Sequence, residues 1–156
     1  MSEDICTNIT LSSLNRVSQN QIIDKDKEIS YANQFRDALK IKSNSIYQPV
    51  GSLSGGNQQK VVLGKWIMTE PDVLILDEPT RGIDVGAKYE IYTIINQLAA
   101  KGKCVIMISS ELPEVLGISD RIYVINNGTV TGELSKEEAK AETVMQCIVA
   151  NKKLGA

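Results

Sequence analysis

Two short groups of residues in this sequence have types and spacing that could do phosphate chemistry. The first is Ser54-Gly55-Gly56, which stands directly before a segment of helical character. The second is Asp77-Glu78, which ends an apolar run. Together they indicate half of a site that hydrolyses a nucleotide, because the first group suits a phosphate and the second suits a metal ion and a water molecule.

The serine and the two glycines favour a phosphate at the start of a helix. Ser54 can cap the helix by accepting a hydrogen bond from a backbone N–H group. Gly55 and Gly56 let the backbone approach a ligand with no side chain in the way. The free N–H groups and the positive end of the helix dipole would then face that ligand. Taken alone, the motif is more often an ordinary junction between a loop and a helix.

Asp77 and Glu78 would be held rigidly if the strand before them is buried in a sheet. Asp77 can hold Mg²⁺, often through a water molecule. Glu78 can orient or deprotonate an attacking water molecule. Taken alone, the pair is more often a solvated acidic loop or the start of a helix. A glycosidase site is not indicated, because the two acids are adjacent and nothing suggests a sugar cleft.

The elements that must position these residues alternate between helix and strand, which predicts a parallel α/β sheet. Helices are expected at about residues 30–42, 57–69, 87–100 and 112–116, followed by a last helix headed by Ser135 with Glu138 in a capping box. Strands are expected at residues 73–77 and 103–109, each covered on both faces, and a hairpin at 121–126 and 129–133 around Asn127-Gly128. Ligands of such sheets lie beyond the carboxyl ends of the strands.

The composition of the chain narrows the classes of function. A chain of 156 residues with 42% hydrophobic and 23% charged residues is an ordinary globular domain. The net charge of -2 argues against a nucleic-acid partner. There is no histidine, which excludes Ser-His-Asp catalysis, Cys-His catalysis and histidine metal sites. The three cysteines match neither a disulfide framework nor a zinc site, which favours a reducing cytosolic setting.

In combination the motifs are far more specific than they are apart. In chain order, LSGGNQQK, VLILDEPT and GIDVG resemble the signature motif, the Walker B strand with its catalytic glutamate, and the D-loop of ABC transporter ATPases. With the later ISSELPEVLGISDRI, they resemble the second of two nucleotide-binding domains fused in one chain in bacterial monosaccharide importers. The galactose/methyl-galactoside and ribose types are the nearest, and the resemblance covers about residues 8–150.

The resemblance implies a partial P-loop NTPase fold, in which a parallel sheet flanked by helices is joined to a helical subdomain. Residues 1–52 would belong to the helical subdomain, 53–134 to the catalytic α/β core, and 135–156 to a C-terminal helix and tail. We expect the N-terminal third of such a domain to be missing, because no GxxxxGK[ST] phosphate-binding loop occurs in these 156 residues. The chain alone is therefore expected to be inactive.

The resemblance also implies roles for individual residues at a site formed between two domains, with ATP and Mg²⁺ as its ligands. The candidates for contact with the terminal phosphate of ATP held by the partner domain's P-loop are Ser54, Gly55 and Gly56. Further candidates for binding ATP are Asn57, Gln58 and Asp84, and Asp84 could also tie the two domains together. The candidate Mg²⁺ ligand is Asp77, and the catalytic candidates are Glu78 and Ser110. Trp66 and Met68, on the signature helix, are expected to pack against the sheet.

The implied partners are those of a sugar importer. They are a second ATPase domain carrying a P-loop, the permease membrane subunits and, indirectly, a periplasmic sugar-binding protein. The implied location is cytoplasmic, peripheral on the inner face of the bacterial cell membrane.

One departure from the family pattern leaves two functions open. Ser110 stands where the switch histidine is usual, and a serine cannot carry positive charge beside a phosphate. The chain is either the ATP-hydrolysing part of a sugar importer or a non-catalytic module that completes a partner's ATP site. A third possibility, a cytosolic ABC ATPase acting on ribosomes or DNA, is disfavoured by the RGIDVG loop and by the acidic charge balance.

Overall fold

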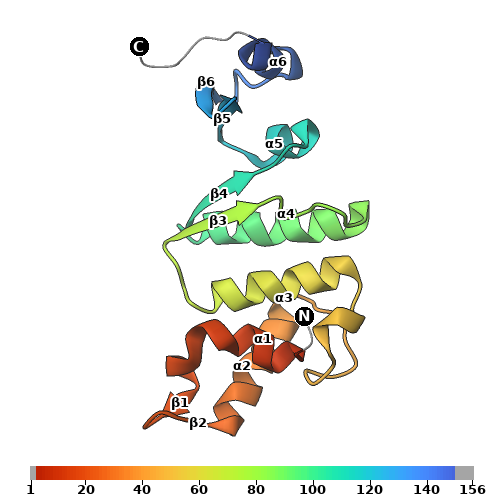
Figure 1. The fold of residues 1–156 in the computed structure, drawn as a ribbon, viewed down its shortest axis with the longest axis vertical. Helices are drawn as coiled ribbons and strands as arrows, with labels where there is room; N and C mark the ends of the chain where they lie inside the picture. The colour runs from red at the N-terminus through yellow and green to blue at the C-terminus, as the bar shows by residue number, and fades with distance from the viewer. Residues whose placement is uncertain (1–2, 150–156) are drawn as a thin grey trace. The chain divides into compact units, whose positions relative to one another are not determined.

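The computed structural model describes residues 3–149, and the chain divides into two compact units, Met1–Ile106 and Met107–Ala156 (Figure 1). The helices are α1 (Ile5–Thr10), α2 (Lys25–Ala38), α3 (Gly55–Ile67), α4 (Val85–Ala100), α5 (Leu112–Ile118) and α6 (Ala141–Val149). The strands are β1 (Ser18–Gln19), β2 (Ile22–Ile23), β3 (Val73–Asp77), β4 (Cys104–Ile108), β5 (Arg121–Asn126) and β6 (Thr129–Ser135). Short 3₁₀ helices cover Leu11–Arg16 and Val50–Ser52. Within residues 3–149, none of these helices has the length and apolarity needed to cross a membrane.

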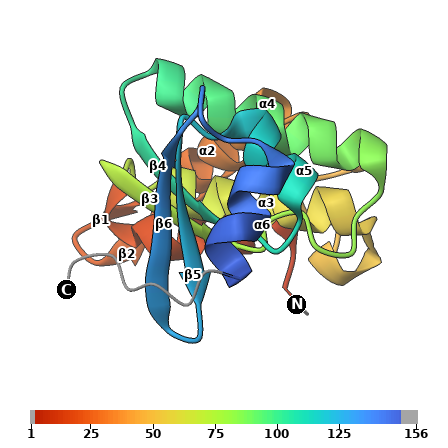
Figure 2. The same ribbon diagram turned by 90° about the horizontal axis from the view of Figure 1, so that it is seen from above.

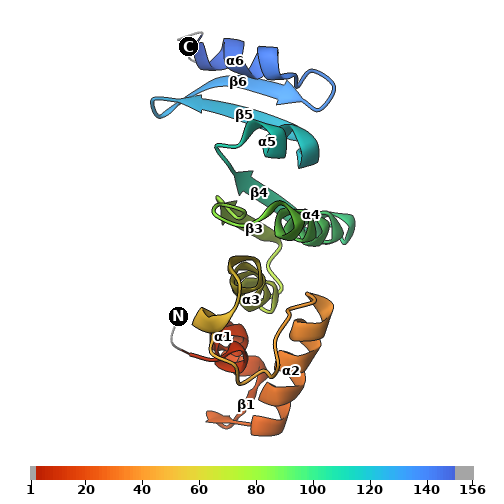
Figure 3. The ribbon, with the colours of Figure 1, turned by 90° about the vertical axis from the view of Figure 1, so that its right-hand side faces the viewer.

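Helices α1, α2 and α3 pack together in the first unit (Figure 3). Asp4 caps α1 by accepting from the amide of Thr7 at 2.8 Å. Asp24 caps α2 by accepting from the amides of Asp26 and Lys27. This cap starts α2 at Lys25, so the predicted start near residue 30 is wrong. The apolar spacing begins at Tyr31 and gives no signal for the polar first turn of α2, which depends on the cap although its Glu28 is buried.

The β3–α4–β4 segment forms a parallel pair, as predicted. The amide of Cys104, which opens β4, donates to the carbonyl of Asp72 directly before β3 at 2.9 Å. The two strands therefore begin side by side and run in the same direction, with α4 as the crossover. Helix α4 buries its predicted inner face at Ile91, Ile94 and Ile95.

The prediction that both strands are covered on both faces is wrong for this chain. Along β3, Leu74 and Leu76 are buried, whereas Val73 is 53% and Ile75 is 63% exposed. No residue of β4 is buried. Apolar runs predict a strand covered on two sides, but among the described residues one face of β3 stays open.

In the second unit, helices α5 and α6 lie on the same side of the β5–β6 hairpin (Figure 2). Ile122, Val124, Leu134 and Val144 form its core. Asn127 and Gly128 have φ values of 48° and 73°, which confirms the predicted hairpin turn.

The predicted helix start at Ser135 is wrong. The amide and hydroxyl of Ser135 both donate to a carboxylate oxygen of Glu138, at 3.0 and 2.9 Å, so the contact of a capping box does form. However, β6 extends through Ser135, the next three residues make a turn, and α6 begins at Ala141. A capping contact settles one turn of backbone and cannot by itself propagate a helix.

Candidate functional site

The site begins at the N-terminus of α3, where Ser54 is exposed and has the extended backbone of a cap residue, with φ -62° and ψ 154°. Its hydroxyl does not cap the helix, so that part of the prediction is wrong. The Ser54 oxygen instead accepts a hydrogen bond from Nδ2 of Asn57 at 2.9 Å. Within the described part of the chain, the first turn of α3 has no side-chain cap, which leaves it suited to an external anion.

Asn57 and Gln58, which follow the glycines, use their side chains on the protein itself. Oδ1 of Asn57 accepts from the backbone amide of Lys42 at 2.9 Å. Nε2 of Gln58 donates to the carbonyl of Leu53 at 2.9 Å. Both bonds hold the approach to α3 in place. The tie between Asn57 and Lys42 spans 15 positions, and no sequence motif marks it.

The two glycines of the motif face other parts of the protein. A Cβ atom built on Gly56 would lie 2.4 Å from the Cβ of Ala87 on α4. A Cβ on Gly55 would lie 3.3 Å from Cγ2 of Ile83. Ordinary carbon contacts are about 3.5–4.0 Å, so Gly56 is required for the close approach of α3 and α4. Whether the same glycines also approach a ligand stays a prediction.

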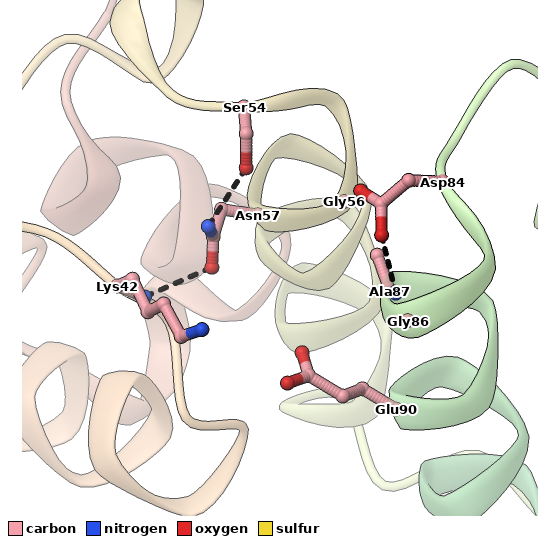
Figure 4. Close-up of a pocket in the computed structure, with 8 residues that line it drawn as sticks. All are labelled: Lys42, Ser54, Gly56, Asn57, Asp84, Gly86, Ala87 and Glu90. Atoms are coloured by element: carbon pink, nitrogen blue, oxygen red, sulfur yellow. Dashed lines mark hydrogen bonds between the residues drawn. The ribbon is translucent and has the colours of Figure 1, made fainter.

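Asp84 completes this region from the start of α4. Its Oδ1 accepts from the amide of Ala87 at 2.9 Å, and this N-cap starts the helix at Val85, two residues earlier than predicted. A shallow cavity of about 240 Å³ opens between the start of α3, the start of α4 and Lys42 (Figure 4). It is lined by Lys42, Ser54, Gly56, Asn57, Asp84, Gly86, Ala87 and Glu90. The structure thus brings four of the candidate ATP-binding residues to one place.

An ion pair between a buried lysine and a half-buried glutamate that lines the cavity was not predicted. Lys60, one turn beyond Asn57, is 1% exposed, and its Nζ lies 2.5 Å from a carboxylate oxygen of Glu90 on α4. The same Nζ donates to the carbonyl of Lys40 at 2.9 Å. The hydrogen bond from Lys60 is the main reason that the pKa of Glu90 is lowered. Lys60 therefore links α3 to α4 and to the segment that follows α2.

The acid pair lies where β3 ends, as predicted. Asp77 is exposed, and Glu78 is half-buried with a φ of 46°. This left-handed conformation is uncommon for a residue with a side chain. The Glu78 carbonyl accepts from the amide of Arg81 at 3.2 Å, which turns the chain sharply after the strand. The buried Pro79 and Thr80 anchor that turn.

The acid pair meets a limited requirement for binding Mg²⁺. Within residues 3–149, no three His, Cys, Asp or Glu side chains form a group that could hold a metal ion. Magnesium in phosphate sites needs only one or two carboxylates, because phosphate oxygens and water supply the other ligands. The exposed carboxylate of Asp77 fits that smaller requirement.

Ser110 belongs to the second unit, in which it is exposed after β4. Its neighbour Ser109 hydrogen bonds through Oγ to the carboxylate of Glu114, which is 4% exposed. Ser109 Oγ also accepts from the amide of Glu111 at 3.0 Å. Glu114 was not predicted as part of this region, because a single acid in a short helix carries no distinguishing pattern. Its contact with Ser109 orders the loop around Ser110.

Trp66 departs from the expected packing on the signature helix. The residue is 47% exposed, and the ammonium group of Lys65 lies 5.3 Å from its ring centroid. Met68 is fully buried, and its packing against the sheet stays a prediction. Helical position explains the difference, since the buried face of α3 passes through Lys60, Leu63 and Gly64.

Comparison with known proteins decides the family of the chain. The family described as "ABC transporter" matches residues 4–81, which contain the start of α3, the cavity's Ser54 and the acids of β3. This chain belongs to the ABC transporter family. The chain is therefore part of an ABC transporter ATPase domain.

Curated relatives of this ABC protein come from bacterial sugar import systems. The chain is 63% identical to the L-arabinose transport ATP-binding protein AraG of Geobacillus stearothermophilus, over 92% of this chain and 28% of that protein. It is 61% identical to the xylose import ATP-binding protein XylG of Moorella thermoacetica, over 96% of this chain and 29% of that protein. It is 52% identical to the ribose import ATP-binding protein RbsA of Clostridium tetani, over 92% of this chain and 28% of that protein. The chain thus spans less than a third of the length of these relatives.

Solved structures confirm the predicted fold class. The ATP-binding cassette MJ1267 of an ABC transporter superposes with a TM-score of 0.77 at 26% identity, over 94% of this chain and 63% of that chain. A nucleotide-free ATP-binding cassette from an ABC transporter superposes with a TM-score of 0.74 at 25% identity, over 96% of this chain and 60% of that chain. The chain therefore has the fold of part of an ABC ATPase cassette, a P-loop NTPase fold.

Proposed function

We propose that this chain is part of the ATP-hydrolysing subunit that powers ABC-type import of a monosaccharide. The observation that carries the proposal is the start of α3, where an exposed serine precedes a helical turn without a side-chain cap among the described residues. Backbone N–H groups and the positive end of a helix dipole at such a turn favour an anion. Ser54, Gly55 and Gly56 would accept the terminal phosphate of ATP held by the P-loop of a second ATPase domain.

Asp77 and Glu78 would act at a different nucleotide, the one held on the P-loop side of their own domain. Asp77 would hold a magnesium ion, which when bound supplies neutralisation of phosphate charge. Glu78 would orient and deprotonate the attacking water molecule. The sharp turn after β3 supports this role, because it fixes the direction in which the Glu78 side chain leaves the sheet.

The proposed partners follow from family membership and from the names of the relatives. They are a second ATPase domain with a P-loop, the permease membrane subunits and, through these, a periplasmic sugar-binding protein. The subunit would lie on the cytoplasmic face of the membrane. The three relatives above are named for arabinose, xylose and ribose, which supports a pentose over galactose as the cargo.

The proposal is tested with the complete ATP-binding subunit assembled with its permease in lipid vesicles. Glu78→Gln should lower ATP turnover by roughly 100-fold or more, because it removes a general base. Glu137→Gln makes the same chemical change on an exposed turn of the second unit and should leave turnover unchanged. Sugar uptake into the vesicles, measured with radiolabelled arabinose, xylose, ribose and galactose, identifies the cargo.

A second function, a non-catalytic module that completes a partner's ATP site, is favoured by one observation. Ser110 is an exposed neutral residue at the switch position. If Glu78→Gln leaves turnover unchanged while Ser54→Ala lowers it, the chain serves only the partner's nucleotide and this second function replaces the first.

A further inference from the structure

The hydrogen bonds around Asn57 form a chain whose direction can be worked out. The backbone amide of Lys42 can only donate, so the Asn57 atom that faces it must be the carbonyl oxygen Oδ1. This removes the usual ambiguity between the oxygen and nitrogen of an asparagine side chain. The amide nitrogen Nδ2 must therefore face Ser54, where it donates to the hydroxyl oxygen at 2.9 Å (Figure 4).

The same reasoning sets the direction of the Ser54 hydroxyl. A serine oxygen carries one hydrogen, and here the oxygen already accepts from Asn57. Its own hydrogen cannot point at Nδ2 and is left to donate to another acceptor, and Ser54 is exposed at the N-terminus of α3. Ser54 is thereby arranged as a donor, which is the role that a phosphate oxygen requires of it.

We propose that Asn57 is a positioning residue that makes Ser54 a hydrogen-bond donor to a phosphate oxygen, and that the backbone at Lys42 holds Asn57 in this orientation. Asn57 therefore does not touch the nucleotide, in contrast to its expected role as an ATP-binding residue. The proposal rests on the function proposed above, since it deepens the role of Ser54.

The surroundings of Asn57 keep this arrangement rigid. One turn further along α3, the buried Lys60 donates to the carbonyl of Lys40 and pairs with Glu90. Two side chains of α3 therefore hold the backbone at residues 40 and 42. A movement of this segment would release Oδ1 of Asn57, and the amide could then rotate and reverse the direction of the chain of hydrogen bonds.

The decisive substitution is Asn57→Asp, which has the same shape. Aspartate still accepts from the Lys42 amide, but its second oxygen cannot donate to Ser54. The Ser54 hydroxyl would then donate to the aspartate and be lost to the phosphate. Gln59→Glu adds the same negative charge two residues further along α3, at a half-buried position outside the site, and serves as the charge control.

The experiment uses the complete subunit with its permease, in a Glu78→Gln background that slows hydrolysis, and titrates ATP against closure of the two ATPase domains. Asn57→Asp should raise the ATP concentration at half-closure roughly tenfold or more, as expected for losing a hydrogen bond to a charged group. Gln59→Glu should shift that concentration by less than about threefold. In a Ser54→Ala background, Asn57→Asp should raise the ATP concentration at half-closure no further than Gln59→Glu does, because the effect of Asn57→Asp depends on the Ser54 hydroxyl.

Hydrogen exchange measured without nucleotide gives an independent readout of the Lys42 amide. Protection at Lys42 should persist in Asn57→Asp and be lost in Asn57→Ala. If Asn57→Asp shifts closure no more than Gln59→Glu, or if Lys42 protection is the same in both Asn57 variants, the positioning role is overturned. If Ser54→Ala leaves closure unchanged, the phosphate contact of the proposed function fails first, and the two failures are thereby distinguished.

Discussion

Replacing Gly56 with alanine should push the first turn of α3 away from α4 and destabilise the protein. The added Cβ would lie 2.4 Å from the Cβ of Ala87, about 1 Å inside an ordinary carbon contact. Overpacking of this kind costs about 1–3 kcal/mol. Alanine recovers up to about 1 kcal/mol through its better helix propensity. With that recovery, the net expectation is a loss of about 0–2 kcal/mol in the free energy of unfolding.

The measurement is urea unfolding of the chain followed by circular dichroism, for Gly56→Ala, Ala87→Gly and the double variant. Ala87→Gly alone should cost about 1 kcal/mol of helix propensity. In the double variant the clashing methyl group is gone, so a favourable coupling equal to the overpacking cost, about 1–3 kcal/mol, should appear. Gly117→Ala is the matched control, because a Cβ there would meet no atom within 4 Å. It should stabilise by up to about 1 kcal/mol.

The result that would refute this reasoning is a Gly56→Ala variant as stable as Gly117→Ala, with no coupling to Ala87→Gly. In that case α3 and α4 do not approach as closely as described, and Gly56 is free to serve only a ligand.

Two further predictions concern the end of α2 and the buried thiol of Cys6. Lys40→Gly should stabilise the protein by about 0.5–1 kcal/mol, because Lys40, two residues beyond α2, has a φ of 51°. Lys40→Ala keeps the strained backbone and should change the stability in urea far less. Burial, with the carboxylates of Glu28 and Asp4, raises the pKa of Cys6 from 9.0 to about 11. A raised thiol pKa favours the protonated native state, so its contribution is complete below pH 9 and is lost as the pH rises through about 11. The free energy of unfolding, measured from pH 8 to 11, should therefore fall with rising pH in a way that Cys6→Ala lacks. Alkylation at pH 8 should modify the exposed Cys104 before the buried Cys6. Equal alkylation rates of the two thiols would contradict the burial of Cys6.

Local backbone preferences were readable from the residues alone. Asn127-Gly128 predicted a hairpin because both residues tolerate positive φ, and the turn has that geometry. The spacing of Ile91, Ile94 and Ile95 predicted the inner face of α4, and the run before Asp77 predicted β3. The order of the signature motif and the acid pair also indicated the family, because several motifs in sequence are far rarer than any one of them.

Tertiary contacts decided what the residues of those motifs do. The sequence predicts Ser54 as a helix cap, but in the structure its hydroxyl oxygen accepts a hydrogen bond from Asn57 instead. Asn57 is itself oriented by the backbone amide of Lys42, from another part of the chain. The approach of a ligand to Gly56 stays a prediction, whereas the structure shows that its missing side chain leaves room for Ala87. The number of faces of β3 that are covered, like the partner of Lys60, depends on which elements pack nearby. A sequence specifies which conformations and bonds each residue can adopt, whereas the choice among them depends on neighbours that only the folded chain brings within reach.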